Sequence, residues 1–236
     1  MSDPANSEEI VTPTEALVDQ TGRPLGKRAL QTRQRILDAT VAELSSKSMR
    51  DLRVIDIARR VGSSPATFYQ YFKDVEDAVL ELAEQAAQRK RITVDSLVGD
   101  WSGDEGYERL RVLIRRTIEH WSEFGSVLSV RNNASDEGDE RFTDVRVRDI
   151  MPLMNTFEEQ IRARHERFRA SEQCDDEGDA GGTRGTIEPY TGGMLAFIML
   201  DRLGMYRDFA FDEGVSLDDL VDTGATVMQF ILTSNR

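Results

Sequence analysis

The sequence predicts an all-α protein. Apolar residues recur every three or four positions along most of the chain, which is the spacing of a buried helix face. No segment alternates apolar and polar residues between hairpin turns, as a half-buried strand would. The 236 residues, of which 39% are hydrophobic and 31% charged, are enough to bury a core in one large domain or two small ones.

The chain opens with an acidic segment. Residues 1–20 hold five acids and no Lys or Arg, and residues 1–22 have no hydrophobic period, so we expect residues 1–22 to be a disordered tail. The start of the chain lacks the basic and apolar regions of a signal peptide. The longest apolar run, Met194–Leu200, is far shorter than the ~20 residues of a membrane span. One cysteine, Cys174, excludes an internal disulfide, so we expect a cytoplasmic protein without a membrane partner.

A small helical domain is expected over residues 23–74. Its first helix begins near Ala29, presents an apolar face over Ile36–Leu44, and ends at Ser45–Ser48. A second, short helix is expected at about Val54–Val61, with its apolar residues turned toward the first.

The next residues have the features of a helix-turn-helix. Gly62 suits a left-handed turn position, Ser64 is a good N-cap, and Pro65 fits the first helical position. They predict a third helix at about Pro65–Phe72. In a helix-turn-helix this last helix enters the major groove of DNA. Periodicity alone also allows a generic helical hairpin with surface tyrosines.

The charge distribution favours contact with phosphate at this domain. The net charge of the chain is -13, which argues against a protein that coats nucleic acid without specificity. Residues 21–75, however, hold eleven bases and five acids. A local basic region attracts phosphate even in an acidic protein. An ordinary solvated surface is the alternative explanation of the same charge.

Residues 32–79 are TRQRILDATVAELSSKSMRDLRVIDIARRVGSSPATFYQYFKDVEDAV. The spacing of the motifs Ile57-Ala58, Gly62, Ala66-Thr67 and Tyr71-Phe72 makes this segment closely resemble the DNA-binding domain of the tetracycline-repressor (TetR) family. The resemblance implies a dimeric transcriptional regulator with three N-terminal helices and a larger helical domain that binds a ligand.

Three positions depart from the family pattern. Ser63 stands where Val or Ile is usual, Leu52-Arg53 where a Thr opens the second helix, and Val75 where a Lys often opens the fourth. Arg53 can replace the threonine with a charged phosphate contact.

The candidate DNA contacts combine one base-reading side chain, Gln70, with polar and basic groups that contact phosphate. They are Arg23, Lys27, Arg28, Arg53, Ser64, Pro65, Ala66, Thr67, Tyr69, Gln70, Tyr71 and Lys73. The first three form either a basic arm or a solvated linker. Phe68 and Phe72 are expected to face the small core.

Residues 75–236 are expected to form the ligand-binding and dimerisation domain. The expected helices are about Val75–Arg91, Asp104–Glu123, Phe124–Asn133, Glu140–Arg169, Glu188–Phe209 and Leu217–Leu232. The fifth of these is apolar on all sides, so it must be covered on every side. The last two helices are expected to pair with a second copy through Met194, Phe197, Ile198, Leu220, Val227 and Ile231, although the core of a monomer would show the same pattern.

An apolar ligand pocket is expected between these helices and the DNA-binding domain. Aromatic and methionine side chains make adaptable pocket walls, and the candidates are Trp121, Phe124, Met151, Met154 and Phe157. Ordinary core packing is the alternative. Arg111, Arg115 and Arg116 either meet an anionic group or form a solvated face.

No chemistry beyond binding is predicted. His120 and His165 are far apart in the sequence without ligands at metal spacing, so we expect surface histidines and no metal or cofactor. No nucleophile–base pair is recognisable, so the protein is not expected to be an enzyme. The favoured function is a repressor that binds a palindromic operator as a homodimer and is released by a small apolar molecule. The alternative is a small-molecule-binding helical dimer with a vestigial DNA-binding head.

Overall fold

The computed structural model describes residues 17–95, 99–172 and 186–234. These ranges contain helices and no strand, which confirms the predicted all-α class, and their β-pairing is limited to an isolated bridge between Val18 and Pro24. The chain divides into two units, one ending at Ala78 and one beginning at Val79, four residues beyond the boundary expected from the sequence. Within the described ranges no helix is long and apolar enough to cross a membrane.

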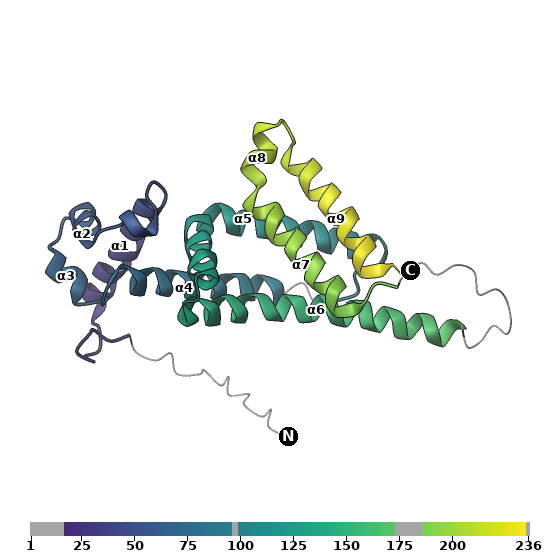
Figure 1. Ribbon diagram of the computed structural model, residues 1–236, viewed down its shortest axis with the longest axis horizontal. Coiled ribbons are helices and arrows are strands. Elements are labelled where there is room, and N and C mark those ends of the chain that lie inside the picture. Colours follow the sequence, from purple (N-terminus) through teal and green to yellow (C-terminus); the bar gives the residue numbers. More distant parts are fainter. Residues whose placement is uncertain (1–16, 96–98, 173–185, 235–236) are drawn as a thin grey trace, which may run out of the picture. The chain divides into compact units, whose positions relative to one another are not determined.

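The first unit contains α1 (Lys27–Leu44), α2 (Val54–Val61) and α3 (Pro65–Tyr69), as Figure 1 shows. A single 3-10 turn, Met49–Asp51, precedes α2. Gly62 has φ +71°, the left-handed conformation expected of it, and the next N–H, that of Ser63, donates to the carbonyl of Ala58 at 2.9 Å.

The helix α3 is shorter than expected. It ends at Tyr69 instead of Phe72, because the chain turns and starts α4 (Val75–Asp95) almost at once. The Asp74 carboxylate accepts the N–H of Asp77 at 2.8 Å, and the Asp77 carboxylate accepts the N–H of Lys73 at 3.0 Å. These two bonds cap the new helix and fix the turn. Phe68 and Phe72 are buried in the core of the head, as expected.

An ionic network joins α1 to α2. The Glu43 carboxylate lies 2.7 Å from Nζ of Lys47 and 2.8 Å from Nε of Arg60, and Lys47 also lies 3.1 Å from Asp56. Hydrogen bonds from Lys47 are the main reason that the pKa of both carboxyls is below its ordinary value. Lys47 and Arg60, two of the bases in residues 21–75, therefore stabilise the fold of the first unit, the expected DNA-binding head.

The second unit is built on two long helices, α5 (Gly103–Asp136) and α6 (Glu140–Glu172). Expected as two helices, α5 is continuous through residues 123–124, because its buried face runs on through Phe124 and Leu128 without a break. The short turn between α5 and α6 contains Gly138 at φ +95°.

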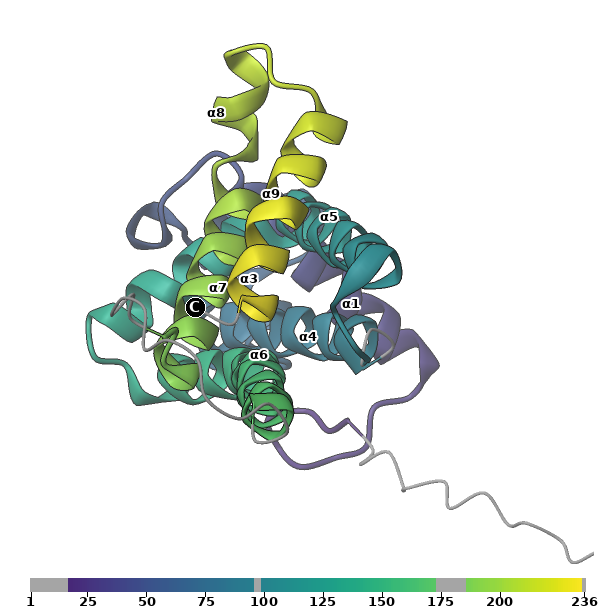
Figure 2. The ribbon, with the colours of Figure 1, turned by 90° about the vertical axis from the view of Figure 1, so that its right-hand side faces the viewer.

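The helices α7 (Pro189–Met205) and α9 (Leu217–Thr233) lie side by side and pack on α5 and α6 (Figure 2). The helix expected over Glu188–Phe209 is broken at Tyr206, and the short α8 (Arg207–Asp212) follows. Gly224 permits the close approach of α9, since a Cβ there would lie 2.9 Å from Leu203 and 3.0 Å from Ile114.

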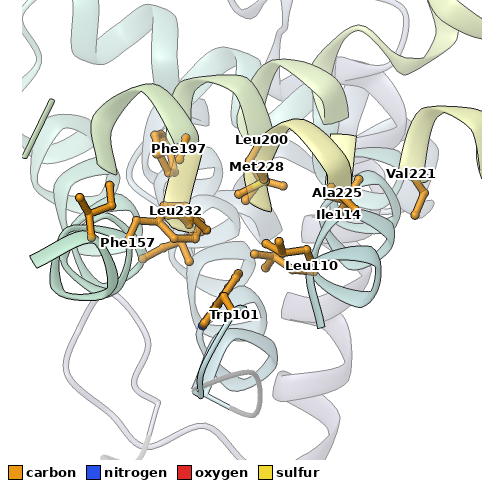
Figure 3. Close-up of a cluster of buried hydrophobic side chains, with 14 of the residues drawn as sticks. Trp101, Leu110, Ile114, Phe157, Phe197, Leu200, Val221, Ala225, Met228 and Leu232 are labelled. Atoms are coloured by element: carbon orange, nitrogen blue, oxygen red, sulfur yellow. The ribbon is translucent and has the colours of Figure 1, made fainter. Parts of the chain in front are cut away.

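The core of the second unit gathers side chains from α5, α6, α7 and α9, with Trp101 at one edge of the cluster (Figure 3). Phe157 is fully buried, and its ring meets the Trp101 ring edge to face at 5.6 Å between centroids. Leu110, Leu200 and Met228 complete the centre of this cluster. Large apolar side chains from four helices thus hold the unit together.

Candidate nucleic-acid interface and effector cavity

The helix α3 presents one side to solvent. Pro65, Ala66 and Gln70 are exposed and Tyr69 is 52% exposed, whereas Phe68, on the opposite side, is buried. Thr67 and Tyr71 are half-buried. The structure therefore brings the expected base-reading side chain, Gln70, onto one exposed end of the short helix with its neighbours.

Ser64 caps this helix. Its hydroxyl oxygen accepts the N–H of Thr67 at 3.3 Å and lies 3.2 Å from the Thr67 hydroxyl. An N-cap of this kind satisfies a backbone donor that the helix itself leaves free. Ser64 thus orients α3 while its exposed side stays at the surface.

The basic candidates are at the surface of the first unit. Lys27 and Arg28 are exposed on the first turn of α1, and Lys73 is exposed between α3 and α4. The side chain of Arg53 is 73% exposed, with its Nε 3.3 Å from Asp56. The guanidinium is in solvent and Asp56 keeps Lys47 as a second partner, so Arg53 can exchange this ion pair for a phosphate.

The segment before α1 is folded against the end of α3. Residues 17–22, expected in the disordered tail, form a turn in which the Asp19 carboxylate accepts the N–H groups of Thr21 and Arg23 at 2.8 and 3.0 Å. The Gln20 N–H donates to the carbonyl of Gln70 at 3.1 Å, and its side-chain amide donates to that of Tyr71 at 3.2 Å. Arg23, which is exposed, is thereby held near the end of α3. Residues 1–16 of the expected tail lie outside the described residues.

A cavity of about 30 Å³ lies among α4, α5, α6 and α7 in the second unit. This is space for roughly two water molecules. Its apolar walls include Leu113, Trp121, Leu128, Phe197 and Leu200, and its polar walls Lys90, Arg116, Thr117, His120, Arg131, Asp149 and Asp201. The walls are therefore much more charged than an apolar pocket.

Three of these charged groups form a buried cluster. Nη1 of Arg131 lies 2.5 Å from Oδ2 of Asp149, and both side chains are 2% exposed. Nζ of Lys90 lies 3.3 Å from Oδ1 of the same carboxylate. Burial alone would raise the pKa of Asp149, but the charges of Lys90 and Arg131 outweigh it and hold the pKa below its ordinary value.

His120 borders the same cavity and is not a surface histidine. Its Nε2 is buried without a hydrogen-bond partner, and its ring lies 5.1 Å from that of Phe124. Burial, and then the charge of Lys90, lowers its pKa to about 4. His120 is therefore neutral at neutral pH, although it lies close to a carboxylate.

The lowered pKa of His120 predicts that the free energy of unfolding falls as the pH drops from 6.5 to about 4. In this window His120 is protonated in the unfolded chain and neutral in the folded chain. Acid therefore favours unfolding, by at most about 3 kcal/mol. Urea unfolding near pH 7.5 and near pH 5 measures the effect. In the His120→Leu variant the free energy of unfolding should depend less on pH in this window. The difference in stability between variant and parent near pH 7.5 measures the effect of the substitution on packing alone. An unchanged profile in the variant would contradict the assignment.

Of the five expected pocket residues, only Trp121 lines the cavity, where its indole N–H donates to Asp201 at 3.2 Å. Phe124 packs beside it in a small core cluster. Phe157 belongs to the main core, Met154 packs against that core, and Met151 is 36% exposed. Helical spacing identifies the inward face of a helix but not which inward side chain borders a void.

The charged walls were missed because Arg131 and Asp149 look like surface residues of long polar helices. The spacing of the sequence held a signal for Asp149, which follows Phe142 and Val145 on the buried face of α6 and precedes Leu153. A lone carboxylate on an apolar face requires a buried cation. Two of the arginines suggested for an anionic group instead pair with α9, Arg111 with Asp222 at 2.7 Å and Arg115 with Asp218 at 2.6 Å.

The expected dimer residues fall into three groups. Ile198 and Val227 are 45% and 43% exposed, and Met194, Leu220 and Ile231 are half-buried. Phe197 is 7% exposed and lies in the core of its own chain, where it lines the cavity. Two apolar side chains that were not singled out are more exposed: Leu195 on α7 at 51% and Phe230 on α9 at 68%.

No group of three His, Cys, Asp or Glu side chains suited to a metal ion occurs within the part of the chain that the structure describes. Cys174 lies outside the described residues.

Comparisons with known proteins agree with this architecture. Residues 36–82 match the family "Bacterial regulatory proteins, tetR family", and residues 94–187 match the "Tetracyclin repressor-like, C-terminal domain". An uncharacterized HTH-type transcriptional regulator of Haemophilus influenzae is 26% identical over 154 residues, which cover 60% of this chain and 70% of that protein.

Solved structures show the same fold at low sequence identity. The fatty acid degradation regulator FadR of Bacillus halodurans has a TM-score of 0.56 at 17% identity, covering 89% of this chain and 97% of its own. FadR of Bacillus subtilis in complex with stearoyl-CoA has a TM-score of 0.56 at 15% identity, covering 85% and 97%. The two family matches together span more than half of the chain, one on the helix-turn-helix and one on the helical domain. The chain therefore belongs to the tetracycline-repressor (TetR) family of DNA-binding transcriptional regulators, which are not enzymes.

Proposed function

We propose that the protein is a transcriptional repressor that binds a palindromic operator as a homodimer and leaves it when a small molecule enters the second unit. The observation that carries this proposal is the exposed, capped α3 with Gln70 exposed directly after its end, in one chain with a cavity bordered by α4. The two sites supply the input and the output of a ligand-responsive regulator.

DNA reading is supported by the chemistry of the head. Gln70 can bond adenine bidentately, and the Tyr69 and Thr67 hydroxyls can bond phosphate. In a dimer the two copies of α3 would enter successive major grooves about 34 Å apart, which requires an approximately palindromic operator.

Dimerisation is supported by exposed apolar side chains on α7 and α9. Ile198 and Leu195 lie one turn apart on α7, and Val227 and Phe230 one turn apart on α9, all at least 43% exposed. Neighbouring helices that both expose large apolar side chains are typical of a subunit interface. Two such helices from each copy would form a four-helix interface.

Release by an effector is supported by the position of Lys90. This residue lies on α4, the helix that directly follows the head in the chain, and its side chain reaches the cavity. An effector that binds one arrangement of α4 better than another shifts the population toward that arrangement. If DNA binds the other arrangement better, the affinity for DNA falls by the coupling free energy, typically about 1–3 kcal/mol. The B. subtilis FadR structure, which holds stearoyl-CoA, is a neighbour in which the fold accommodates a ligand.

The test of DNA binding compares two variants of the head. Gln70→Ala should change base preference at a cost of about 1–3 kcal/mol on the best sequence, and Lys73→Ala should weaken all sequences alike and lower the salt dependence by about one phosphate contact. Duplexes selected from a randomised pool by the purified protein, followed by binding isotherms at several salt concentrations, measure both effects.

Gln88→Ala, an exposed change on α4 in the second unit, is the matched control and should bind like the parent. If both head variants also bind like the parent, the head assignment is wrong. If the parent selects no duplex, the protein is a ligand-binding dimer with a vestigial head.

A further inference from the structure

The cavity of the second unit holds more positive than negative charge. In its buried cluster two cations, Lys90 and Arg131, share the single carboxylate of Asp149. The remaining charged walls, Arg116 and Asp201, are one base and one acid. The side chain of Arg116 is 61% exposed, and Asp201 is half-buried and accepts the Trp121 indole N–H. The buried cluster of Lys90, Arg131 and Asp149 therefore carries one positive charge more than its carboxylate neutralises.

An uncompensated charge in such a place is costly. The Lys90 side chain is 13% exposed and that of Arg131 is 2% exposed, so water screens them little. A buried cation without its own anion costs several kcal/mol. The buried Nε2 of His120, which has no hydrogen-bond partner, is a further unsatisfied polar atom at the same walls.

We propose that the effector of this protein is an organic carboxylate, whose anionic group binds Lys90 and Arg131 and whose apolar body lies against Leu113, Phe197 and Leu200. This inference rests on the proposed function, since it names the class of molecule that the same cavity takes. A carboxylate supplies the missing charge and can accept hydrogen bonds from the two cations, of which Arg131 also donates to the Asn132 side chain at 3.1 and 3.2 Å. An alcohol or an ester of the same shape supplies no charge.

The cavity volume explains why binding would act as a switch. About 30 Å³ accepts the carboxylate group but not the body of a larger acid, so the walls must move apart to admit it. Lys90 is the cavity group contributed by α4, and it is held to α6 by Asp149. An incoming carboxylate replaces Asp149 as the partner of Lys90. The ion pair that attaches α4 to α6 is then lost, and α4 can move. The same group therefore provides recognition and movement.

Binding of matched compounds tests the charge requirement. Isothermal calorimetry and thermal unfolding of the full chain are measured with butanoate, octanoate and benzoate, and with the alcohol and the amine of the same carbon skeleton. At least one acid should bind and raise the unfolding temperature, while its alcohol and amine bind at least about tenfold more weakly. If no acid binds, or if an alcohol binds as well as its acid, the proposal is overturned.

Two substitutions of the cluster should act in opposite directions. Lys90→Met should weaken binding of the acid by about tenfold, whereas Asp149→Asn should tighten it, because the competing carboxylate is gone. A loss of folding stability would lower the affinity of both variants for the acid. Opposite changes in affinity therefore cannot come from a merely structural effect. Arg162→Met, an exposed change on α6 at a residue that pairs within its own helix, is the control and should leave the affinity unchanged.

DNA titrations with the same acids separate this proposal from the proposed function. An acid that binds as predicted but never changes operator affinity would leave the carboxylate site standing and remove the release mechanism. A neutral compound that releases DNA while the acids fail to bind would leave the sensor standing and remove the carboxylate.

Discussion

Val227→Asp is expected to produce a folded monomer. Val227 is 43% exposed on α9, beside Phe230 at 68%, so the aspartate meets solvent in the monomer and the core is untouched. In a dimer closed through α7 and α9 the new carboxylate would be buried without a partner, at a cost of several kcal/mol per copy. The substitution therefore acts on association and not on the fold.

Sedimentation velocity measures the change in mass, and operator binding should fall by at least about a hundredfold, since a monomer engages one half-site. Val112→Asp is the matched control: the same substitution at 45% exposure, but on α5. A Val227→Asp protein that sediments like the parent would exclude this face from the interface.

The second large effect is expected for Phe157→Ala. Phe157 has no exposed surface and packs edge to face on Trp101, so its removal leaves a cavity in the main core. Such truncations cost about 3–5 kcal/mol. Urea unfolding measures the loss. Met151→Ala, six residues earlier on the same helix and 36% exposed, should cost far less.

The same pair of variants distinguishes core from pocket. The sequence assigns Phe157 and Met151 alike to the ligand pocket, whereas the structure places one in the core and the other at the surface. A Phe157→Ala protein of parental stability that no longer responds to any effector would restore the assignment to the pocket.

The head could be predicted nearly to the residue because its signals are local. Gly62, Ser64 and Pro65 each act on the backbone within two or three positions, so the turn and the start of α3 follow from the sequence alone. The end of α3 was predicted three residues too far. Its stop depends on two hydrogen bonds that begin the next helix, from the Asp77 N–H to Asp74 and from the Lys73 N–H to Asp77, and apolar spacing does not record them.

The second unit was predictable in its helices but not in its site. Apolar periodicity located α5, α6, α7 and α9, yet it placed a false break at residues 123–124 and missed the real one at Tyr206. The cavity is the space that the side chains of four helices leave unfilled where they meet. It is therefore a property of the packed unit and not of any one helix. Asp149 on α6 and Arg131 on α5 each stand at a buried position among apolar residues, and these positions could have revealed the charged cluster.

The network of Glu43, Lys47, Asp56 and Arg60 has a consequence for experiments on the head. Added salt lowers the free energy gained when bound protein displaces counterions from DNA, and it also screens the ion pairs that join α1 to α2. Both effects reduce apparent affinity, one through the complex and one through the folded fraction of the head. The slope of log K against log salt therefore counts phosphate contacts only when circular dichroism shows the same helix content at every salt concentration. Without that measurement, internal ion pairs would be counted as contacts to the operator.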